Sequence, residues 1–276
     1  MSLDDPKPFL AAFDAIVLVA NSPSAAVALR EGGFPQRTLF VFFNRVFNVL
    51  DHPFAEDSLL VSRATPSGSS LVYKDELDRS LDRLRPGRFH GLLVLKVAEN
   101  EVINPREDFG SVPMVPLDLT ERFSAIYPRG RIPSSGFAIA LWLAEMRLGK
   151  PIRLVGFSGV REGTARVLDV HDWTWEQVVL DLCYRKDLLS PPADQTPWPA
   201  EGLLDRFPEF SAADFDAVAA GVLARRLGAT DRAVDQLFKA VKPQIRLLEL
   251  LRGFKPQSRK SRARQKLLDR LGRNEG

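Results

Sequence analysis

Short runs of almost uninterrupted apolar residues recur along the first two thirds of the chain. Five such runs stand out, at residues 15–20, 38–43, 59–62, 92–97 and 151–157. Strands that are apolar on both faces are typical of a parallel sheet that is covered by helices on both sides. The runs therefore predict the central strands of a buried parallel sheet.

Helical spacing of apolar residues fills two of the intervals between these runs. Residues 76–84 and 136–148 carry it, and Gly149 stands where a left-handed residue would end the second helix. Strands that alternate with helices imply right-handed crossovers. We therefore predict a doubly wound, mostly parallel α/β sheet that forms a single Rossmann-like domain over residues 1–189.

The pattern turns helical from residue 172 onward. Helical spacing covers residues 174–188, 212–227, 232–251 and 262–271. Residues 190–199 contain four prolines, which favours a connector. Residues 190–276 are accordingly predicted to form a Pro-rich connector and a helical C-terminal region with a basic tail.

The composition is that of a globular protein. Of the 276 residues, 45% are hydrophobic and 26% are charged, which excludes a disordered chain. The one cysteine, Cys183, cannot form an internal disulfide, so a reducing cytoplasm is the expected compartment. Apolar stretches such as 136–144 are shorter than the roughly 20 residues that a transmembrane helix needs.

The formal net charge of +3 is spread unevenly along the chain. Residues 253–276 hold eight Lys or Arg against two Asp or Glu, so the rest of the chain has a net charge of −3. A solvated tail and an attachment to an anionic surface both fit that basic segment. Peripheral contact with an anionic membrane through residues 255–273 is one expectation, and the slightly acidic body argues against binding of nucleic acid.

Several familiar sites are missing from the sequence. Neither a dinucleotide fingerprint nor a P-loop follows any of the predicted strands. Residues 156–160 approach a nucleophile elbow, but Val160 replaces its final glycine. One cysteine and three scattered histidines cannot assemble a structural zinc site. Asp214 and Asp216 lie at a predicted helix start, where acidic residues stabilise the first turn, so we expect no metal and no cofactor.

Two segments have the strand–turn–helix form that binds anions. In the first, residues 21–24 follow the opening strand, and Ser22 fits an N-cap while Pro23 fits a first helical residue. In the second, residues 131–136 open a helix with an arginine, two serines and a glycine. Helix starts at the carboxyl ends of parallel strands present free N–H groups to phosphates. Simple capping is the alternative for both segments.

Asn44 and His171 are the single residues that point most directly to a ligand. Asn44 follows the strand at 38–43, where its amide can donate and accept hydrogen bonds; a turn residue is the alternative. His171 precedes a helix that Thr174 and Gln177 are predicted to open as a capping box. The positive end of that helix disfavours imidazolium, and a general base must be neutral. A histidine packed beside neighbouring tryptophans is the other interpretation.

Taken together, these segments resemble the sialyltransferases that use CMP-activated sialic acid. Asn21-Ser22-Pro23-Ser24 is similar to the Asn-Gly-Pro-Ser loop that cradles the nucleotide in the bacterial lipooligosaccharide type. Asn44 is similar to the asparagine that contacts the nucleotide after the second strand of that family.

The second half of the chain carries the rest of the resemblance. Residues 131–136, the helix that follows and the segment ending at Phe157 are similar to a helix–strand segment shared with the animal type. His171 and Glu176 have the form of the His-x-x-x-x-Glu element, in which the histidine is the catalytic base.

The resemblance implies a GT-A-variant fold and an inverting, metal-independent glycosyltransferase. The donor would be a CMP-sugar carrying sialic acid or a related acidic sugar, and the acceptor a hydroxyl of a saccharide or glycolipid. The implied catalytic residues are His171 as base and Glu176 as an orienting group. The implied nucleotide- and donor-binding residues are Asn21, Ser22, Ser24, Asn44, Arg131, Ser134, Ser135, Gly136 and Phe157. Such an enzyme would serve bacterial lipopolysaccharide or capsule synthesis in the cytoplasm, peripheral to the inner membrane, and a homo-oligomer is compatible with it.

The chain departs from the family between its last predicted strand and His171. Residues 158–170 contain none of the tyrosines that bind the leaving phosphate in the bacterial type. A catalytically inactive nucleotide-binding or scaffold protein of the same fold is therefore the alternative. A flavodoxin-like module with an unrelated ligand is a second one.

Overall fold

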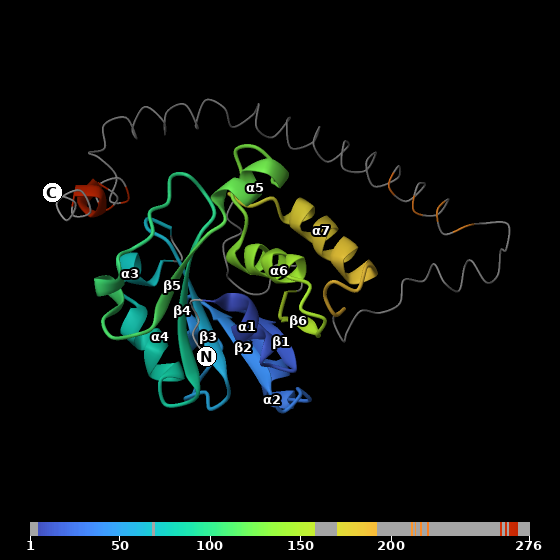
Figure 1. Cartoon of the computed structure of the whole chain (residues 1–276), viewed down its shortest axis with the longest axis horizontal. Coiled ribbons are helices and arrows are strands. Elements are labelled where there is room, and N and C mark those ends of the chain that lie inside the picture. Colours follow the sequence, from blue (N-terminus) through green and yellow to red (C-terminus); the bar gives the residue numbers. More distant parts are fainter. Residues whose placement is uncertain are drawn as a thin grey trace, which may run out of the picture. The chain divides into compact units, whose positions relative to one another are not determined.

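A computed structural model of the chain describes residues 5–67, 70–157 and 170–191, together with residues 211, 213, 216, 220, 260, 263 and 265–269 (Figure 1). The chain divides into two compact units, one of residues 1–192 with 259–276 and one of residues 193–258. Nearly all described residues belong to the first unit. The prediction of a connector and helical region over 190–276 lies almost wholly outside the described residues.

A six-stranded sheet forms the centre of the first unit. Its strands are all parallel and have the spatial order β5-β4-β3-β2-β1-β6. They are β1 (Ala15–Val19), β2 (Thr38–Phe43), β3 (Ser58–Arg63), β4 (Phe89–Lys96), β5 (Met114–Asp118) and β6 (Ile152–Val155). Every residue of β1, β2 and β3 is buried. The predicted parallel sheet with apolar residues on both faces is thereby confirmed.

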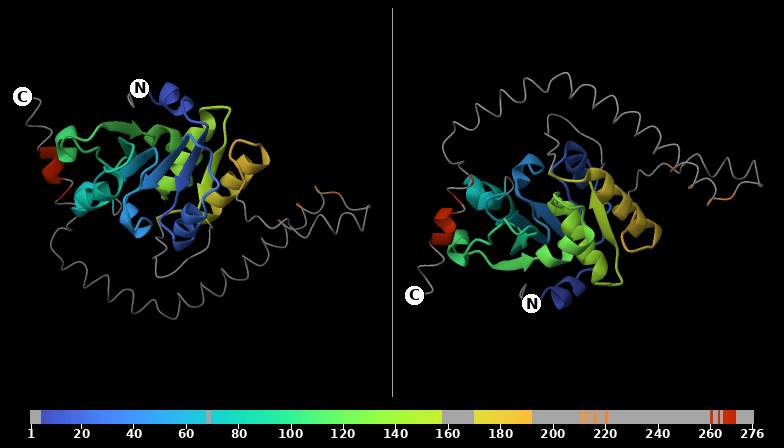
Figure 2. Two further views of the ribbon diagram at one scale, coloured as in Figure 1. Left: turned by 90° about the horizontal axis from the view of Figure 1, so that it is seen from below. Right: turned by 90° about the horizontal axis from the view of Figure 1, so that it is seen from above.

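Helices cover both faces of this sheet (Figures 1 and 2). Alternate residues of β1 show the division, because Val17 packs in one apolar cluster and Leu18 in the other. The Val17 face is covered by α2 (Pro23–Glu31), η1 (Val46–Asn48), α3 (Leu71–Lys74), α4 (Leu77–Leu84) and η2 (Arg106–Phe109). The Leu18 face is covered by α1 (Pro6–Ala11), α5 (Thr120–Ile126), α6 (Ser135–Glu145) and α7 (Trp173–Arg185). This arrangement confirms the doubly wound α/β architecture.

The strand order places a topological switch point between β1 and β6. The chain moves outward from β1 through β5 and then returns to pair β6 with β1 on its other side. Ligands of open α/β sheets bind outside the carboxyl ends of the strands at such a point. A ligand site is therefore expected at the loops that follow β1 and β6.

Several local details differ from the expectations. The pattern missed β5, because Pro116 interrupts it and, as an edge strand, it has exposed residues that break the apolar run. Helix α6 ends at Glu145 rather than at residue 148, and Gly149 lies beyond it with φ +68°. Helix α7 begins at Trp173, because Asp172 accepts the N–H of Trp175 and so caps the helix in place of Thr174. Strand β3 continues to Arg63.

Candidate functional site

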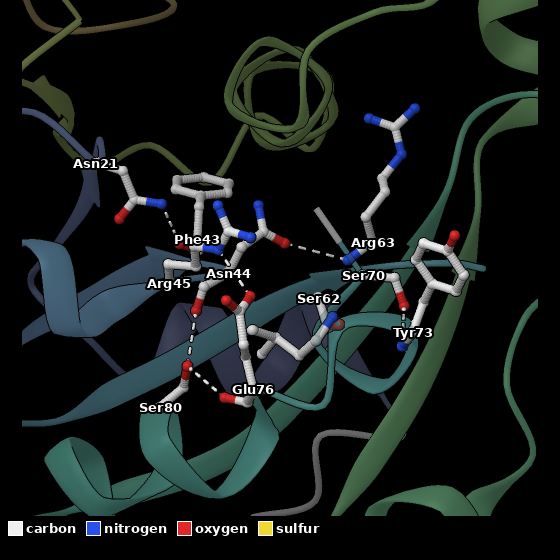
Figure 3. A network of polar contacts seen from close by, with 11 residues as sticks. Asn21, Phe43, Asn44, Arg45, Ser62, Arg63, Ser70, Tyr73, Glu76 and Ser80 are labelled. Carbon is white, nitrogen blue, oxygen red and sulfur yellow. Dashed lines mark hydrogen bonds and ion pairs between the residues drawn. The ribbon is translucent and has the colours of Figure 1, made fainter. Parts of the chain in front are cut away.

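The loops that follow β1, β2 and β3 meet at the carboxyl edge of the sheet (Figure 3). The Asn21 amide donates from Nδ2 to the carbonyl oxygen of Phe43 at 2.6 Å. Asn44, with φ 49°, accepts at Oδ1 the backbone N–H of Arg63 at 3.3 Å. The structure therefore brings Asn21 and Asn44 together. The Nδ2 of Asn21 binds the end of β2, and the Oδ1 of Asn44 binds the end of β3.

The start of α2 closes the switch point against β6. Ser22 caps α2 by accepting the N–H of Ala25, and Pro23 follows in the first turn, as predicted. The Ser22 hydroxyl also lies 3.0 Å from the Gly156 carbonyl oxygen and 3.0 Å from the Ser24 hydroxyl. A Cβ on Gly156 would lie 2.3 Å from the Ser22 Oγ, and the φ of Gly156 is +76°. Glycine is therefore needed where β6 passes α2.

Arg63 is the residue at this edge that the sequence analysis did not select. Its side chain is 4% exposed, and its Nε lies 2.8 Å from Oε1 of Glu101, an ion pair without the geometry of a hydrogen bond. Nη1 donates to the Pro133 carbonyl oxygen at 3.1 Å and to the Ser135 Oγ at 3.3 Å. The guanidinium therefore joins β3 to the start of α6. An arginine at the end of a buried apolar strand was the signal that could have found it.

Glu101 holds Arg63 from the loop after β4. This carboxylate accepts at Oε2 the backbone N–H groups of Val97 at 2.9 Å and Ala98 at 3.2 Å. Glu101 is 5% exposed. A buried charge pair persists only when its remaining lone pairs are satisfied in this way.

Glu176 binds the N-terminus of α6 from the first turn of α7. Its Oε1 accepts the Ser134 backbone N–H at 2.7 Å and the Tyr127 hydroxyl at 2.8 Å, and its Oε2 accepts the Ser134 hydroxyl at 2.6 Å. Burial raises the pKa of this carboxyl, against the opposing effect of the Ser134 and Tyr127 donors and of the Arg63 charge. Glu176 therefore orients the start of α6, and both donors of Ser134 are directed at it.

His171 is held by the loop that leads into α6. Its Nδ1 lies 2.6 Å from the carbonyl oxygen of Ile132. A carbonyl can only accept, so Nδ1 carries the proton and the lone pair is on Nε2, which makes no hydrogen bond to a described residue. Burial lowers the pKa of His171, and the Arg63 charge lowers it further, against the opposing hydrogen bond to Ile132. The imidazole is thus neutral near pH 7, with burial rather than the helix as the main cause.

Phe157 and Arg131 are the remaining predicted residues, and only Phe157 packs against the start of α6. Phe157 packs so closely on α6 that a Cβ at Gly136 would lie 2.1 Å from its ring, and its centroid is 6.1 Å from that of Phe43. Arg131 is exposed, and among the described residues its guanidinium makes no hydrogen bond or ion pair. Tyr127, which the sequence analysis missed, links Glu176 to the backbone N–H of Asp172 at 2.8 Å.

Comparisons with known proteins returned no relative of this chain. No family model matches the sequence, and no curated protein or solved structure matches it. Within the described residues, no group of three or more His, Cys, Asp or Glu is placed to hold a metal ion. Among those residues, no helix has the length and apolar character needed to cross a membrane.

Proposed function

We propose that the protein is an inverting glycosyltransferase that moves sialic acid or a related acidic sugar from a CMP-activated donor to a saccharide hydroxyl. The observation that carries the proposal is the neutral His171, whose Nδ1 proton is committed to Ile132 and whose Nε2 is left as a base. His171 and Arg63 both contact residues 132–135, His171 at the Ile132 carbonyl oxygen and Arg63 at the Ser135 hydroxyl. This supports a shared site for the two side chains.

In this mechanism Nε2 of His171 accepts the proton of the acceptor hydroxyl while its oxygen attacks the anomeric carbon. The new carbon–oxygen bond forms as the bond to the phosphate oxygen breaks, and CMP leaves with the electron pair. Attack opposite the leaving group inverts the anomeric centre. Such proton transfer contributes about 10²–10⁴-fold in rate.

The nucleotide would lie across the switch point. The residues that we assign to it are Asn21, Ser22, Ser24, Asn44, Ser135, Gly136 and Phe157, all on loops or helix starts at the carboxyl edge. A single phosphodiester develops less negative charge on leaving than a diphosphate does. Helix N-termini and hydroxyls can then stabilise it without a divalent cation.

The test is transfer from CMP-N-acetylneuraminate and CMP-Kdo to saccharide acceptors, with and without a chelator. His171→Asn should abolish CMP release and keep CMP affinity in calorimetry. The control is His90→Asn, since His90 pairs with Asp57 at the opposite edge of the sheet. Full turnover in His171→Asn would remove the proposed base. Binding of CMP without turnover in the natural protein would instead support the inactive nucleotide-binding alternative.

Peripheral attachment to an anionic membrane is the second part of the proposal. Eight basic residues within 255–273 would each add about 1 kcal/mol near an anionic surface. Vesicles of phosphatidylcholine with phosphatidylglycerol should bind the protein, and salt should release it. Equal binding to vesicles of phosphatidylcholine alone would contradict this part.

A further inference from the structure

Arg63 is more buried than its bonding explains. Its Nε pairs with Glu101, and Nη1 uses both hydrogens on Pro133 and Ser135. Nε is buried without a hydrogen bond of good geometry, and Nη2 makes no hydrogen bond to a described residue, while the side chain as a whole is 4% exposed. A guanidinium has five N–H donors, and buried donors in native proteins are nearly always satisfied.

The first turn of α6 lies directly against this guanidinium. The helix has eleven residues, and Ser135 at its start contacts Nη1 through Oγ. The N–H groups of Ser135 and Gly136 have no acceptor inside the helix. By contrast, the N–H and the hydroxyl of Ser134 both donate to Glu176, and the Phe137 N–H donates to the Ser134 hydroxyl oxygen. The Arg63 guanidinium and the first turn of α6, which are in contact through Nη1, thus have three donor groups without a described partner: Nη2 of Arg63 and two backbone N–H groups.

One guanidinium and two carboxylates lie around these donors. Glu101 neutralises Arg63, and the carboxylate of Glu176 is held by three donors. Because Glu176 already holds the Ser134 end of α6, the donors left for a ligand are Nη2 of Arg63 and the backbone N–H groups of Ser135 and Gly136.

We propose that Arg63 supplies the cationic contact for an anionic group of the ligand, with the N–H groups of Ser135 and Gly136 beside it. The ligand's identity rests on the proposed function, whereas the anion contact does not. Two groups of a CMP-sugar have the required chemistry, the phosphate and the carboxylate of an acidic sugar. A planar guanidinium binds either through paired charge-assisted hydrogen bonds.

Two variants and a matched control test this contact. Arg63→Gln with Glu101→Gln removes both charges together, so that no carboxylate is left buried without its partner. Glu101→Gln alone keeps Arg63 and removes the charge that neutralises it. The control is Arg88→Gln with Glu56→Gln, an exposed ion pair elsewhere on the unit. Calorimetry then compares CMP with cytidine and CMP-N-acetylneuraminate with CMP, and a thermal-shift series uses inorganic phosphate.

The double variant at Arg63 should lose about tenfold or more in affinity for the anionic ligand. The loss should fall on CMP and not on cytidine if the phosphate is the group bound. It should fall only on CMP-N-acetylneuraminate if the carboxylate is. Glu101→Gln should bind the same anion several-fold more tightly, because the positive charge is no longer neutralised. The Arg88 pair should change neither affinity.

Unchanged affinity for every anion in the folded double variant would overturn the inference. If that variant shows no cooperative unfolding transition, Glu101→Gln decides, and no gain in affinity then overturns it. Phosphate stabilisation that depends on Arg63 in a protein without affinity for cytidine nucleotides would refute the proposed donor and keep the Arg63 contact. An absence of any anion effect on the natural protein would refute the Arg63 contact itself.

Discussion

The Glu176 carboxylate receives both the backbone N–H and the hydroxyl of Ser134, at 2.7 and 2.6 Å. A carboxylate from α7 therefore occupies the position at the N-terminus of α6 where an anion is most stable. The same loop supplies the Ile132 carbonyl oxygen that holds His171, so Glu176 and His171 both bind the segment that leads into α6.

Replacing Glu176 with Gln should destabilise the protein. The amide cannot accept the Ser134 hydroxyl and N–H and the Tyr127 hydroxyl as the two carboxylate oxygens do, and hydrogen bonds to charged groups contribute about 1.5–3 kcal/mol. We expect a loss of about that size in the free energy of unfolding, measured in urea. Glu145→Gln, which breaks an exposed pair with Arg122, should cost less than about 1 kcal/mol. Equal effects of the two changes would mean that Glu176 does not clamp α6.

Tyr127→Phe should distinguish the contribution of the Tyr127 hydroxyl from that of its ring. The ring still packs on Phe123 and Phe137, at centroid distances of 6.4 and 6.0 Å. The hydrogen bonds to Glu176 and Asp172 are lost, so we expect about 1–2 kcal/mol lower stability and slower transfer. Tyr184→Phe is the control, because Tyr184 is partly buried on α7 and makes no hydrogen bond through its hydroxyl to a described residue. A stable Tyr127→Phe with full turnover would exclude Tyr127 as a positioning residue.

The pH dependence of the protein should reflect the lowered pKa of His171. The neutral base then forms at lower pH than an exposed histidine, so kcat/KM for transfer should rise with pH with a midpoint below 6.5 and stay level at neutral pH. A midpoint above 6.5 would contradict the burial argument.

The free energy of unfolding should also depend on pH through His171, and it should increase as the pH rises. The unfolded chain binds the His171 proton with the ordinary pKa of 6.5, above that of the folded state. Between the two values the unfolded state holds more protons, so stability rises with pH through that window and is complete above 6.5. Urea unfolding across this range should show a steeper rise for the natural protein than for His171→Asn.

Gly136→Ala should destabilise the protein, although alanine has the higher helix propensity. Alanine is the better helix former, but its Cβ would lie 2.1 Å from the Phe157 ring. Overpacking of this kind costs about 1–3 kcal/mol. Adding Phe157→Leu should recover part of the loss, because it removes the ring that clashes. No recovery in the double variant would place the strain elsewhere.

Much of the site could be predicted because its loops carry local signals. Ser22 as an N-cap and Pro23 as a first-turn residue predict a helix start from local sequence, and α2 begins there in the structure. The end of α6 and the cap of α7 were wrong by a few residues, because Gly149 and Thr174 offered local signals that Met146 and Asp172 override in the structure. Strand β5 escaped prediction because an exposed edge strand with a proline has no apolar run.

The sequence by itself determined the layered architecture, since continuous apolar runs are stable only in strands buried on both faces, and the helices between them must cover those faces. It also determined His171 and Asn44 as residues of interest from their places beside strands and helix starts. Only the tertiary structure decided the roles of Arg63, Glu101 and Tyr127. Arg63 and Glu101 are 38 positions apart in sequence, and Tyr127 and Glu176 are 49 apart, and no local pattern records a contact that folding alone creates. The tautomer and neutrality of His171 likewise came from the fold, because burial and the Ile132 carbonyl set them.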